Sequence, residues 1–230
     1  MKTDILQWDS DFFGVKTASI TLDGSETPED IDRQLSDLKG DDVRLVYLFS
    51  PQSIPQGHAG KWLLADRKRS YMNPSPQANG LSAGVKPFQG NPSALHSLAI
   101  EAGAHSRFAV DPNIPAKKTE DLYTTWIDNS VLRGFADHVF TIQDRDEPNA
   151  AMITLRRCGG EISIGLLATH PDHRRRGLAR KLIKAAETIA AADGLQLEVT
   201  TQADNHEACA FYSSCNFNTF TDTYVYHIWL

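Results

Sequence analysis

The fold is decided by the segment Thr169-His170-Pro171-Asp172-His173-Arg174-Arg175-Arg176-Gly177-Leu178-Ala179-Arg180. Before it, Ile162, Ile164 and Leu166 alternate with small or polar residues, which predicts a strand over residues 161–169. After it, apolar residues recur with helical spacing from about residue 177 to 192. The first N–H groups of a helix lack partners within the helix, and the helix dipole favours an anion beside them. This strand–turn–helix unit therefore indicates a site for a phosphate or pyrophosphate.

The charge at this helix start supports that interpretation. Three arginines, residues 174–176, lie at the end of the helix where the dipole disfavours cations. A bound anion would offset this unfavourable placement. Gly177 and Ala179 are small, so phosphate oxygens could approach the backbone closely. The alternative is a basic helix end on a solvated surface.

Two segments resemble the motifs of one enzyme family. Arg174, Gly177 and Ala179 match Arg/Gln-x-x-Gly-x-Gly/Ala, the acetyl-CoA-binding motif of the GNAT N-acetyltransferases. Asn205-His206-Glu207-Ala208-Cys209-Ala210-Phe211-Tyr212 resembles the family's second motif, Asn-x-x-Ala-x-x-Phe-Tyr. The resemblance implies an acetyl-CoA site formed by Leu167, Ala168, Thr169, Arg174, Arg175, Arg176, Gly177, Leu178, Ala179, Arg180, Asn205 and Tyr212.

The same resemblance implies how these residues act. The strand through residues 166–169 is expected to diverge from the next strand, so that backbone groups of Leu167 and Thr169 hold the thioester and the pantetheine arm. Tyr212 is expected to act as the general acid that protonates the departing CoA thiolate. A tyrosine that only packs in the core is the alternative for this residue. Gly165 predicts a bulge or a close backbone approach in the strand.

Segments outside the two motifs resemble the GNAT members that acetylate dTDP-linked 4-amino-4,6-dideoxyhexoses. These segments are residues 8–14, 106–108, 122–130, 200–202 and 223–226. The resemblance implies a nucleotide-sugar site bordered by Phe12, Phe13, Arg107, Tyr123, Trp126 and Asn129. Ordinary core packing is the alternative for the aromatic residues, and a surface ion pair is the alternative for Arg107. No general base stands out, and Glu161 and the histidines remain open candidates.

Composition narrows the class of protein. The chain has 230 residues and a formal net charge of −6, which disfavours nucleic acid and anionic membranes as partners. The start carries no apolar signal segment, and no apolar stretch is long enough to span a bilayer, so a cytoplasmic protein is expected. Three scattered cysteines give neither a disulfide framework nor a zinc pattern. His170 and His173 lack a third ligand, so no metal is expected.

Strand and helix patterns alternate along the chain, which predicts an α/β protein with the GNAT fold. Residues 73–92 are rich in Asn, Pro, Ser and Gly, so we expect a smaller N-terminal α/β domain with its linker over 1–92 and the acetyltransferase domain over 93–230. Thr27, Ser93 and Thr119 are the predicted N-caps of three helices. The last strands could pair across a homodimer.

Three functions remain open. The first is acetyl transfer from acetyl-CoA to a nucleotide-linked amino sugar. The second is a GNAT enzyme for another amine, such as a protein N-terminus, a polyamine or an aminoglycoside. The third is an acyl-CoA-binding module without catalysis. An acidic acceptor cleft would favour a cationic amine, whereas a basic cleft would favour a nucleotide sugar.

Overall fold

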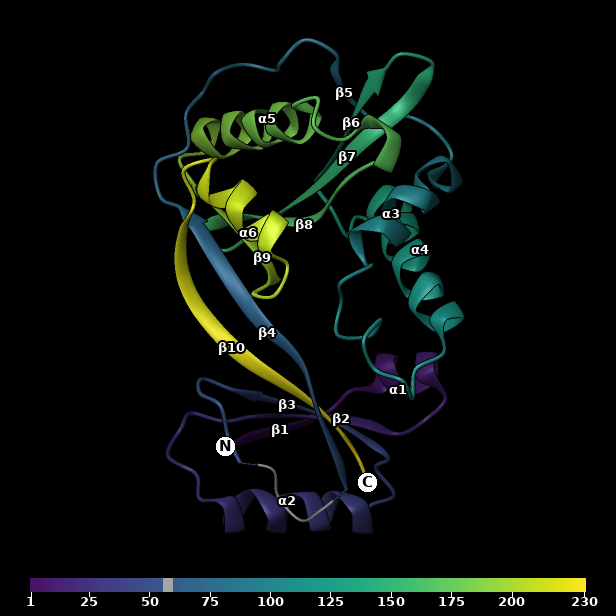
Figure 1. Ribbon diagram of the computed structural model, residues 1–230, viewed down its shortest axis with the longest axis vertical. Helices are drawn as coiled ribbons and strands as arrows, with labels where there is room; N and C mark the ends of the chain where they lie inside the picture. The colour runs from purple at the N-terminus through teal and green to yellow at the C-terminus, as the bar shows by residue number, and fades with distance from the viewer. Residues whose placement is uncertain (56–59) are drawn as a thin grey trace.

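One mixed sheet runs through the whole molecule (Figure 1). The computed structural model describes residues 1–55 and 60–230, and within them ten strands pair in the order β1-β2-β3-β10-β4-β9-β8-β7-β6-β5. The strands are β1 (Lys2–Ile5), β2 (Thr17–Thr21), β3 (Leu45–Ser50), β4 (Lys61–Asn73), β5 (Val85–Pro87), β6 (His138–Asp144), β7 (Glu147–Cys158), β8 (Glu161–Thr169), β9 (Gln196–Gln202) and β10 (Asn218–Trp229).

Helices alternate with these strands along the chain, which confirms the α/β class. They are α1 (Gln7–Phe13), α2 (Pro28–Gly40), α3 (His96–Ala102), α4 (Ala116–Leu132), α5 (Leu178–Ala192) and α6 (His206–Ser213), with short 3₁₀ turns at Pro92–Leu95 and Pro171–His173. None of the helices among the described residues has the length and apolar character needed to cross a membrane.

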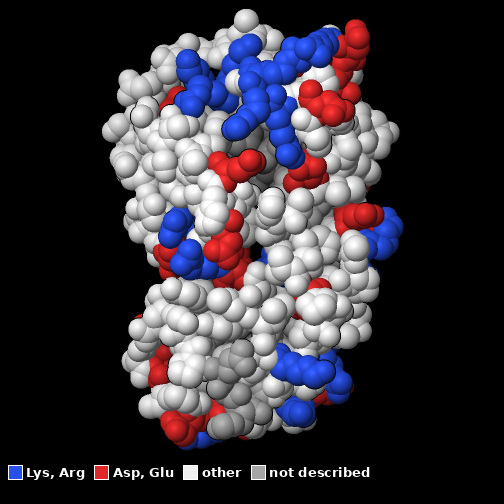
Figure 2. Space-filling view, in the orientation of Figure 1, with Lys and Arg blue, Asp and Glu red and all other residues white. Residues whose placement is uncertain are grey.

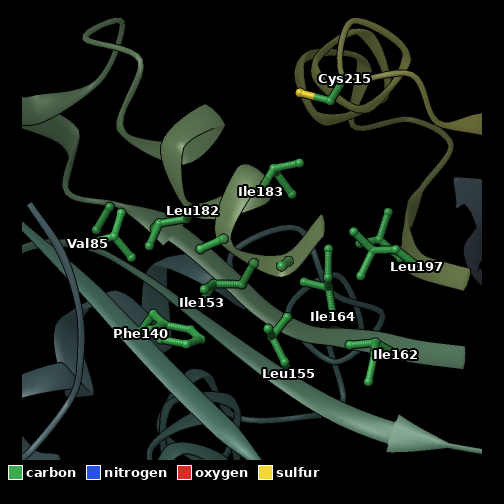
Figure 3. Packing of buried hydrophobic residues seen from close by; sticks show 14 of the residues in the cluster. Val85, Phe140, Ile153, Leu155, Ile162, Ile164, Leu182, Ile183, Leu197 and Cys215 are labelled. Carbon is green, nitrogen blue, oxygen red and sulfur yellow. The ribbon is translucent and has the colours of Figure 1, made fainter. Parts of the chain in front are cut away.

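The upper half of the sheet is covered on both faces. Neighbouring residues of a strand point to opposite faces, so Ile153 of β7 packs toward α5 whereas Met152 packs toward α3 and α4. Figure 3 shows Leu182 and Ile183 of α5 lying over the β7 and β8 side chains in the core on the α5 side of the sheet. Figure 1 places α5 and α6 apart from the α3–α4 pair.

The lower half of the sheet has its own core, in which α2 covers β2, β3 and the end of β10. Figure 1 shows β4 and β10 running side by side through both halves, and β10 pairs with β3 along one edge and with β4 along the other. The expected boundary at residue 92 stays a prediction. Residues 85–87 of the expected linker form β5, which pairs with β6.

Of the three N-caps predicted above, the structure confirms one and contradicts two. Thr27 caps α2, as predicted, and the structure adds a capping box with Asp30. The prediction for Ser93 is wrong, because Asn91 caps a 3₁₀ turn there and α3 begins only at His96. The prediction for Thr119 is also wrong, because α4 begins one turn earlier after Pro115, whose fixed φ suits a helix start. Neither β1 nor α1 was predicted.

The pairing between β8 and β9 ends before either strand does, and this leaves a gap in the sheet. These parallel strands pair from Glu161↔Gln196 to Ile164↔Val199 and no further, so residues 165–169 diverge from β9 as expected. A register shift in the β7–β8 pairing places Thr154 opposite both Gly165 and Leu166. Gly165 therefore begins a bulge, as predicted, and the buried Thr154 hydroxyl accepts a hydrogen bond from the Leu166 N–H at 2.8 Å.

Candidate active site

A cleft of about 420 Å³ opens where β8 diverges from β9. It is bounded by the last residues of β8, the start of α5, α6 and the end of α3. Eleven of the twelve predicted cofactor residues line it, namely Leu167, Ala168, Thr169, Arg174, Arg175, Gly177, Leu178, Ala179, Arg180, Asn205 and Tyr212. Arg176 does not line the cleft. Segments about forty residues apart in the sequence thus meet around one space.

The start of α5 offers free N–H groups to this cleft. The first helical bond runs from the Lys181 N–H to the Gly177 carbonyl at 3.1 Å, so the N–H groups of residues 178–180 have no acceptor within the helix. Gly177 holds a φ of 74°, a left-handed conformation that costs glycine little and other residues more. Three adjacent free donors at the positive end of a fifteen-residue helix suit a pyrophosphate.

The four arginines of this segment have different partners. Arg174 pairs with Glu101 of α3, and Arg176 pairs with Asp144 of β6, which draws it away from the cleft. Arg180 donates to the backbone carbonyl and hydroxyl of Ser214, each at 2.8 Å. Arg175 lines the cleft and has no ion pair among residues 1–55 and 60–230.

Charged side chains gather around this opening. Figure 2 shows Lys and Arg side chains collected above a hollow in the upper half of the visible face, with acidic side chains on both sides of it. The acidic residues among the lining are Glu101 and Glu207. A carboxylate already paired with arginine, as Glu101 is, adds little net negative charge to the cleft.

The diverging end of β8 exposes backbone groups. His170 N–H donates to the Ala150 carbonyl and Leu166 N–H donates to Thr154, so both face β7. Backbone groups alternate in direction along a strand, so those of Leu167 and Thr169 point into the gap toward β9. These are the two residues expected to hold the thioester and the pantetheine arm.

Tyr212 reaches the cleft from a buried ring. Its ring centroid lies 5.9 Å from that of Tyr71 and 5.8 Å from that of Phe217. Burial raises the pKa of the hydroxyl well above its usual range, so it stays protonated at neutral pH. The hydroxyl has no hydrogen-bond partner among the described residues, although the residue lines the cleft. Asn205 caps α6 by accepting from the Ala208 N–H at 3.1 Å.

His170 and His173 are neighbours, with ring centroids 5.6 Å apart. His173 Nδ1 lies 2.8 Å from Asp144 Oδ2, and this hydrogen bond, together with the Arg176 charge, holds the pKa of Asp144 below its usual value. Within residues 1–55 and 60–230, no group of three or more His, Cys, Asp or Glu side chains could hold a metal ion. Through their hydrogen bonds, His170 and His173 hold the turn before α5 in place.

A second cleft, of about 480 Å³, borders β8 on its other face. Ile162 and Ile164 point toward α5, so Ser163 between them points the opposite way and lines this space. The lining residues are mostly apolar and aromatic: Trp8, Phe108, Leu122, Thr125, Trp126, Asn129, Phe135, Ala136, Thr154, Arg156, Cys158, Ser163 and Gly165. Gly165 is at the bulge, so the two clefts border adjacent parts of one strand.

The six predicted acceptor residues are distributed around this second cleft. Trp126 and Asn129 line it. Phe12 and Phe13 lie one layer behind, where Phe12 stacks on Trp8 with centroids 4.9 Å apart and Phe13 stacks on Phe108 at 5.5 Å. Tyr123 lines a smaller cavity of about 220 Å³, and Arg107 lines neither space.

Sequence reasoning missed several lining residues. Trp8 and Phe108 belong to segments that were singled out, and a search for every aromatic residue within those segments could have found both. Phe135 and Arg156 carry no such signal, because Phe135 lies in the loop between α4 and β6 and Arg156 lies in the last part of β7, both outside any recognisable motif.

Arg107 is held inside the molecule rather than on its surface. Its guanidinium carbon lies 3.9 Å from the Tyr47 ring centroid, and its Nη1 donates to His227 Nε2 at 3.2 Å. Arginine only donates, so His227 must donate from Nδ1 to Asp111, whose Oδ2 is 2.7 Å away. Burial lowers the pKa of His227 and keeps the ring neutral. The surface ion pair that was the alternative for Arg107 is therefore absent from the described residues, and stacking on Tyr47 replaces it.

Asp111 joins this buried chain of polar groups to the end of β10. Its Oδ2 also accepts from Trp229 Nε1 at 3.0 Å. Burial opposes ionisation of Asp111, but hydrogen bonds from His227, Asn113 and Trp229 outweigh it and lower the pKa to about 2. These hydrogen bonds hold in place the loop that carries Phe108, and Phe108 lines the second cleft.

Two partly buried carboxylates are easier to protonate than usual. Burial raises the pKa of Asp66 to about 6, against the opposing charges of Arg107 and Lys68. Burial also raises the pKa of Glu198, and a hydrogen bond with Glu161 acts in the same direction. Glu198 pairs in register with Ser163 but is not one of the residues that line the second cleft.

The acetyltransferase (GNAT) family matches residues 103–217, which include both diverging strands and both motifs. No curated protein matches the sequence.

Solved structures share the fold at low identity. A GNAT-family protein from Novosphingobium aromaticivorans is 18% identical with a TM-score of 0.57, over 93% of this chain and 84% of its own. An N-acetyltransferase from Sphaerobacter thermophilus is 12% identical with a TM-score of 0.57, over 98% of this chain and 75% of its own. A protein of unknown function from Staphylococcus epidermidis is 6% identical with a TM-score of 0.63, over 97% and 88%.

The expected fold is therefore confirmed by a family match that covers half of the chain and by similar structures that cover nearly all of it. The chain belongs to the GNAT family of acetyltransferases, acyl-CoA-dependent N-acetyltransferases that generally use acetyl-CoA as the donor.

Proposed function

We propose that this protein transfers the acetyl group of acetyl-CoA to the amino group of a nucleotide-linked amino sugar, with dTDP-4-amino-4,6-dideoxygalactose (dTDP-fucosamine) as the first acceptor to test. The observation that carries this proposal is the charge of the second cleft. The described residues that line it include one arginine and no carboxylate. Such a lining favours an anionic acceptor over a polyamine or an aminoglycoside.

The donor is held by groups that fit it. Pyrophosphate oxygens accept from the free N–H groups of residues 178–180, and Arg175 adds an unpaired positive charge. The backbone groups of Leu167 and Thr169 bind the pantetheine arm and orient the thioester in the gap between β8 and β9. The side-chain NH₂ of Asn205 lines the same cleft and is free of its capping role.

The acceptor amine reaches the thioester from the second cleft, at the bulge. The neutral amine attacks the thioester carbon, so a C–N bond forms and the C–S bond breaks. The proton lost by the amine passes to solvent, and the Tyr212 hydroxyl donates a proton to the departing thiolate. A backbone N–H in the gap stabilises the oxyanion formed on the way.

The test is CoA release from acetyl-CoA with dTDP-4-amino-4,6-dideoxygalactose as the acceptor. The matched control acceptor is dTDP-glucose, which offers the same nucleotide without an amine. Turnover with the amino sugar and none with dTDP-glucose supports the proposal.

A panel of a peptide N-terminus, spermidine and an aminoglycoside tests the second function. Turnover with one of these amines alone overturns the proposed acceptor and leaves the donor in place. Tight acetyl-CoA binding without turnover on any amine favours a binding module.

A further inference from the structure

Arg156 is an arginine without an anionic partner in an apolar cleft. It lies opposite Ser163 in the β7–β8 pairing, and its guanidinium carbon is 5.8 Å from the Phe135 ring centroid. It forms no ion pair among residues 1–55 and 60–230, whereas its neighbour Arg157 pairs with Asp193. No carboxylate from the described part of the chain lines the cleft around it. A guanidinium in such surroundings is free to form charge-assisted hydrogen bonds with an incoming anion.

Three large aromatic side chains line the same cleft and stay exposed. Trp8, Trp126 and Phe135 are 50%, 37% and 48% exposed, although such rings are normally covered. A second ring supports each tryptophan: Phe12 stacks on Trp8, and Tyr123 stacks on Trp126 with centroids 5.9 Å apart. Exposed rings that are held in place provide flat surfaces on which a planar or sugar ring can stack.

The inner end of the cleft is narrow. A Cβ added to Gly165 would lie 2.9 Å from Thr154 Oγ1 and 3.7 Å from Trp126 Cζ2, so the Trp126 edge passes close over the bulge. A ligand can therefore extend from the exposed rings and Arg156 at the outside to the bulge at the inside, where β8 meets the donor cleft.

We propose that the second cleft binds a ring-bearing anion, with the phosphate charge on Arg156 and a ring against the exposed aromatic side chains. The nucleoside diphosphate half of the acceptor is the ligand of this class to test. This proposal rests on the proposed function for the identity of that ligand. It adds a specificity-determining residue, Arg156, and a binding surface formed by Trp8, Trp126 and Phe135.

The cleft carries its own reporter, because Cys158 lines it and is exposed. The experiment measures the rate of Cys158 alkylation by iodoacetamide, read by peptide mass spectrometry, with and without dTDP. Saturating CoA is present in both arms, so that dTDP cannot act from the donor cleft. Cys209, which lies on α6 and outside the second cleft, is the internal control in the same digest.

We expect dTDP to slow Cys158 alkylation about tenfold or more at saturation, and Cys209 alkylation to stay unchanged. Thymidine and inorganic pyrophosphate, each alone, test the ring and the charge separately and should protect less. No protection of Cys158 by dTDP at millimolar concentration overturns the proposal.

Arg156→Gln removes the charge and retains hydrogen-bonding capacity. We expect it to weaken dTDP protection about tenfold or more, and to raise the acceptor KM with little change in kcat. Arg133→Gln is the matched control, because Arg133 is an exposed arginine at the end of α4 that does not line the cleft. Equal protection in the wild type and Arg156→Gln overturns the role of Arg156.

The two proposals fail in different ways. Protection of Cys158 by dTDP without turnover on any nucleotide amino sugar overturns the proposed acceptor and supports the ligand class of the cleft. Turnover on the nucleotide sugar with an unchanged acceptor KM in Arg156→Gln supports the proposed function and overturns this inference.

Discussion

Tyr212 is the residue on which the proton balance of the reaction depends. Its ring packs between Tyr71, Phe211 and Phe217, and only the hydroxyl is available for chemistry. Tyr212→Phe keeps this packing and removes the proton donor. We expect kcat to fall about tenfold to a hundredfold and the acetyl-CoA KM to stay within about twofold. Steady-state kinetics measures both, and an unchanged kcat would exclude Tyr212 as the acid.

Asp66 makes the stability of the protein depend on pH. Its folded-state pKa, about 6, is above the unfolded value, so folding favours its protonated form. The favourable contribution is complete below about pH 4 and is lost as the pH rises through 6. Asp66→Asn should therefore stabilise the protein by about 1 to 2 kcal/mol at pH 8, after allowance for solvent screening.

Thermal unfolding at two pH values tests this prediction. The gain in Tm for Asp66→Asn should disappear at pH 4. An equal gain at both pH values would mean that ionisation of Asp66 is not its cause.

The bulge in β8 is the element that brings the two clefts together. Thr154→Val removes the acceptor of the buried Leu166 N–H while preserving side-chain shape. We expect a loss of about 1 to 3 kcal/mol in the free energy of unfolding and a lower kcat/KM for the acceptor. Urea unfolding and steady-state kinetics measure the two effects.

Thr141 of β6 provides the matched control for this change. Its hydroxyl is equally buried and has no hydrogen-bond partner among the described residues. Thr141→Val should be neutral or slightly stabilising, because no bond is lost. Similar losses in the two variants would show that the hydroxyl of Thr154 has no special role.

The start of α5 depends on one backbone conformation. A Cβ on Gly177 would meet no atom within 4 Å, so the requirement for glycine there comes from its φ of 74° alone. Gly177→Ala should cost about 1 kcal/mol and raise the acetyl-CoA KM, since the free N–H groups follow it directly. Thermal unfolding and steady-state kinetics measure the two effects.

Gly194, just beyond the other end of α5, has a φ of 67° and equally free space. Gly194→Ala should show a similar loss of stability with an unchanged KM. A raised KM in both variants would attribute the effect to general destabilisation.

Elements were predictable where local chemistry decides them. Thr27 followed by Pro28 forms a strong start signal, so the start of α2 was predicted correctly. Ser93 and Thr119 are good capping residues, but neither caps a helix in the structure. Asn91 caps the 3₁₀ turn that contains Ser93, and Thr119 is buried inside α4. Caps compete, and tertiary packing decides between them.

At the scale of the molecule, one buried network joins distant parts of the chain. Asp111 accepts hydrogen bonds from His227 and Trp229 of β10, and His227 accepts from Arg107. Asp111→Ala leaves these buried donors unpaired and should cost about 3 to 5 kcal/mol. Thermal unfolding measures this loss. A loss below about 1 kcal/mol would mean that water replaces the carboxylate.

The donor cleft could be predicted because most of its predicted residues lie in or beside two motifs, each of which is a continuous stretch of sequence. The second cleft could not, because Trp8, Phe135 and Arg156 come from α1, the α4–β6 loop and β7, and only folding places them together. Trp126 and Asn129 were found because α4 carries both. A homodimer stays a prediction: β10 already pairs on both sides from residue 224 onward, and only residues 218–223 leave the edge toward β3 open.

The position of β10 between β3 and β4 has a consequence for synthesis. Residues 45–50 leave the ribosome early, but their partner on one side follows only after most of the chain has been made. Until then β2 and β3 present a bare, apolar strand edge, which is prone to pairing with other chains. The nascent protein must therefore be protected until residues 224–229 arrive, so abundant chaperones should improve its yield.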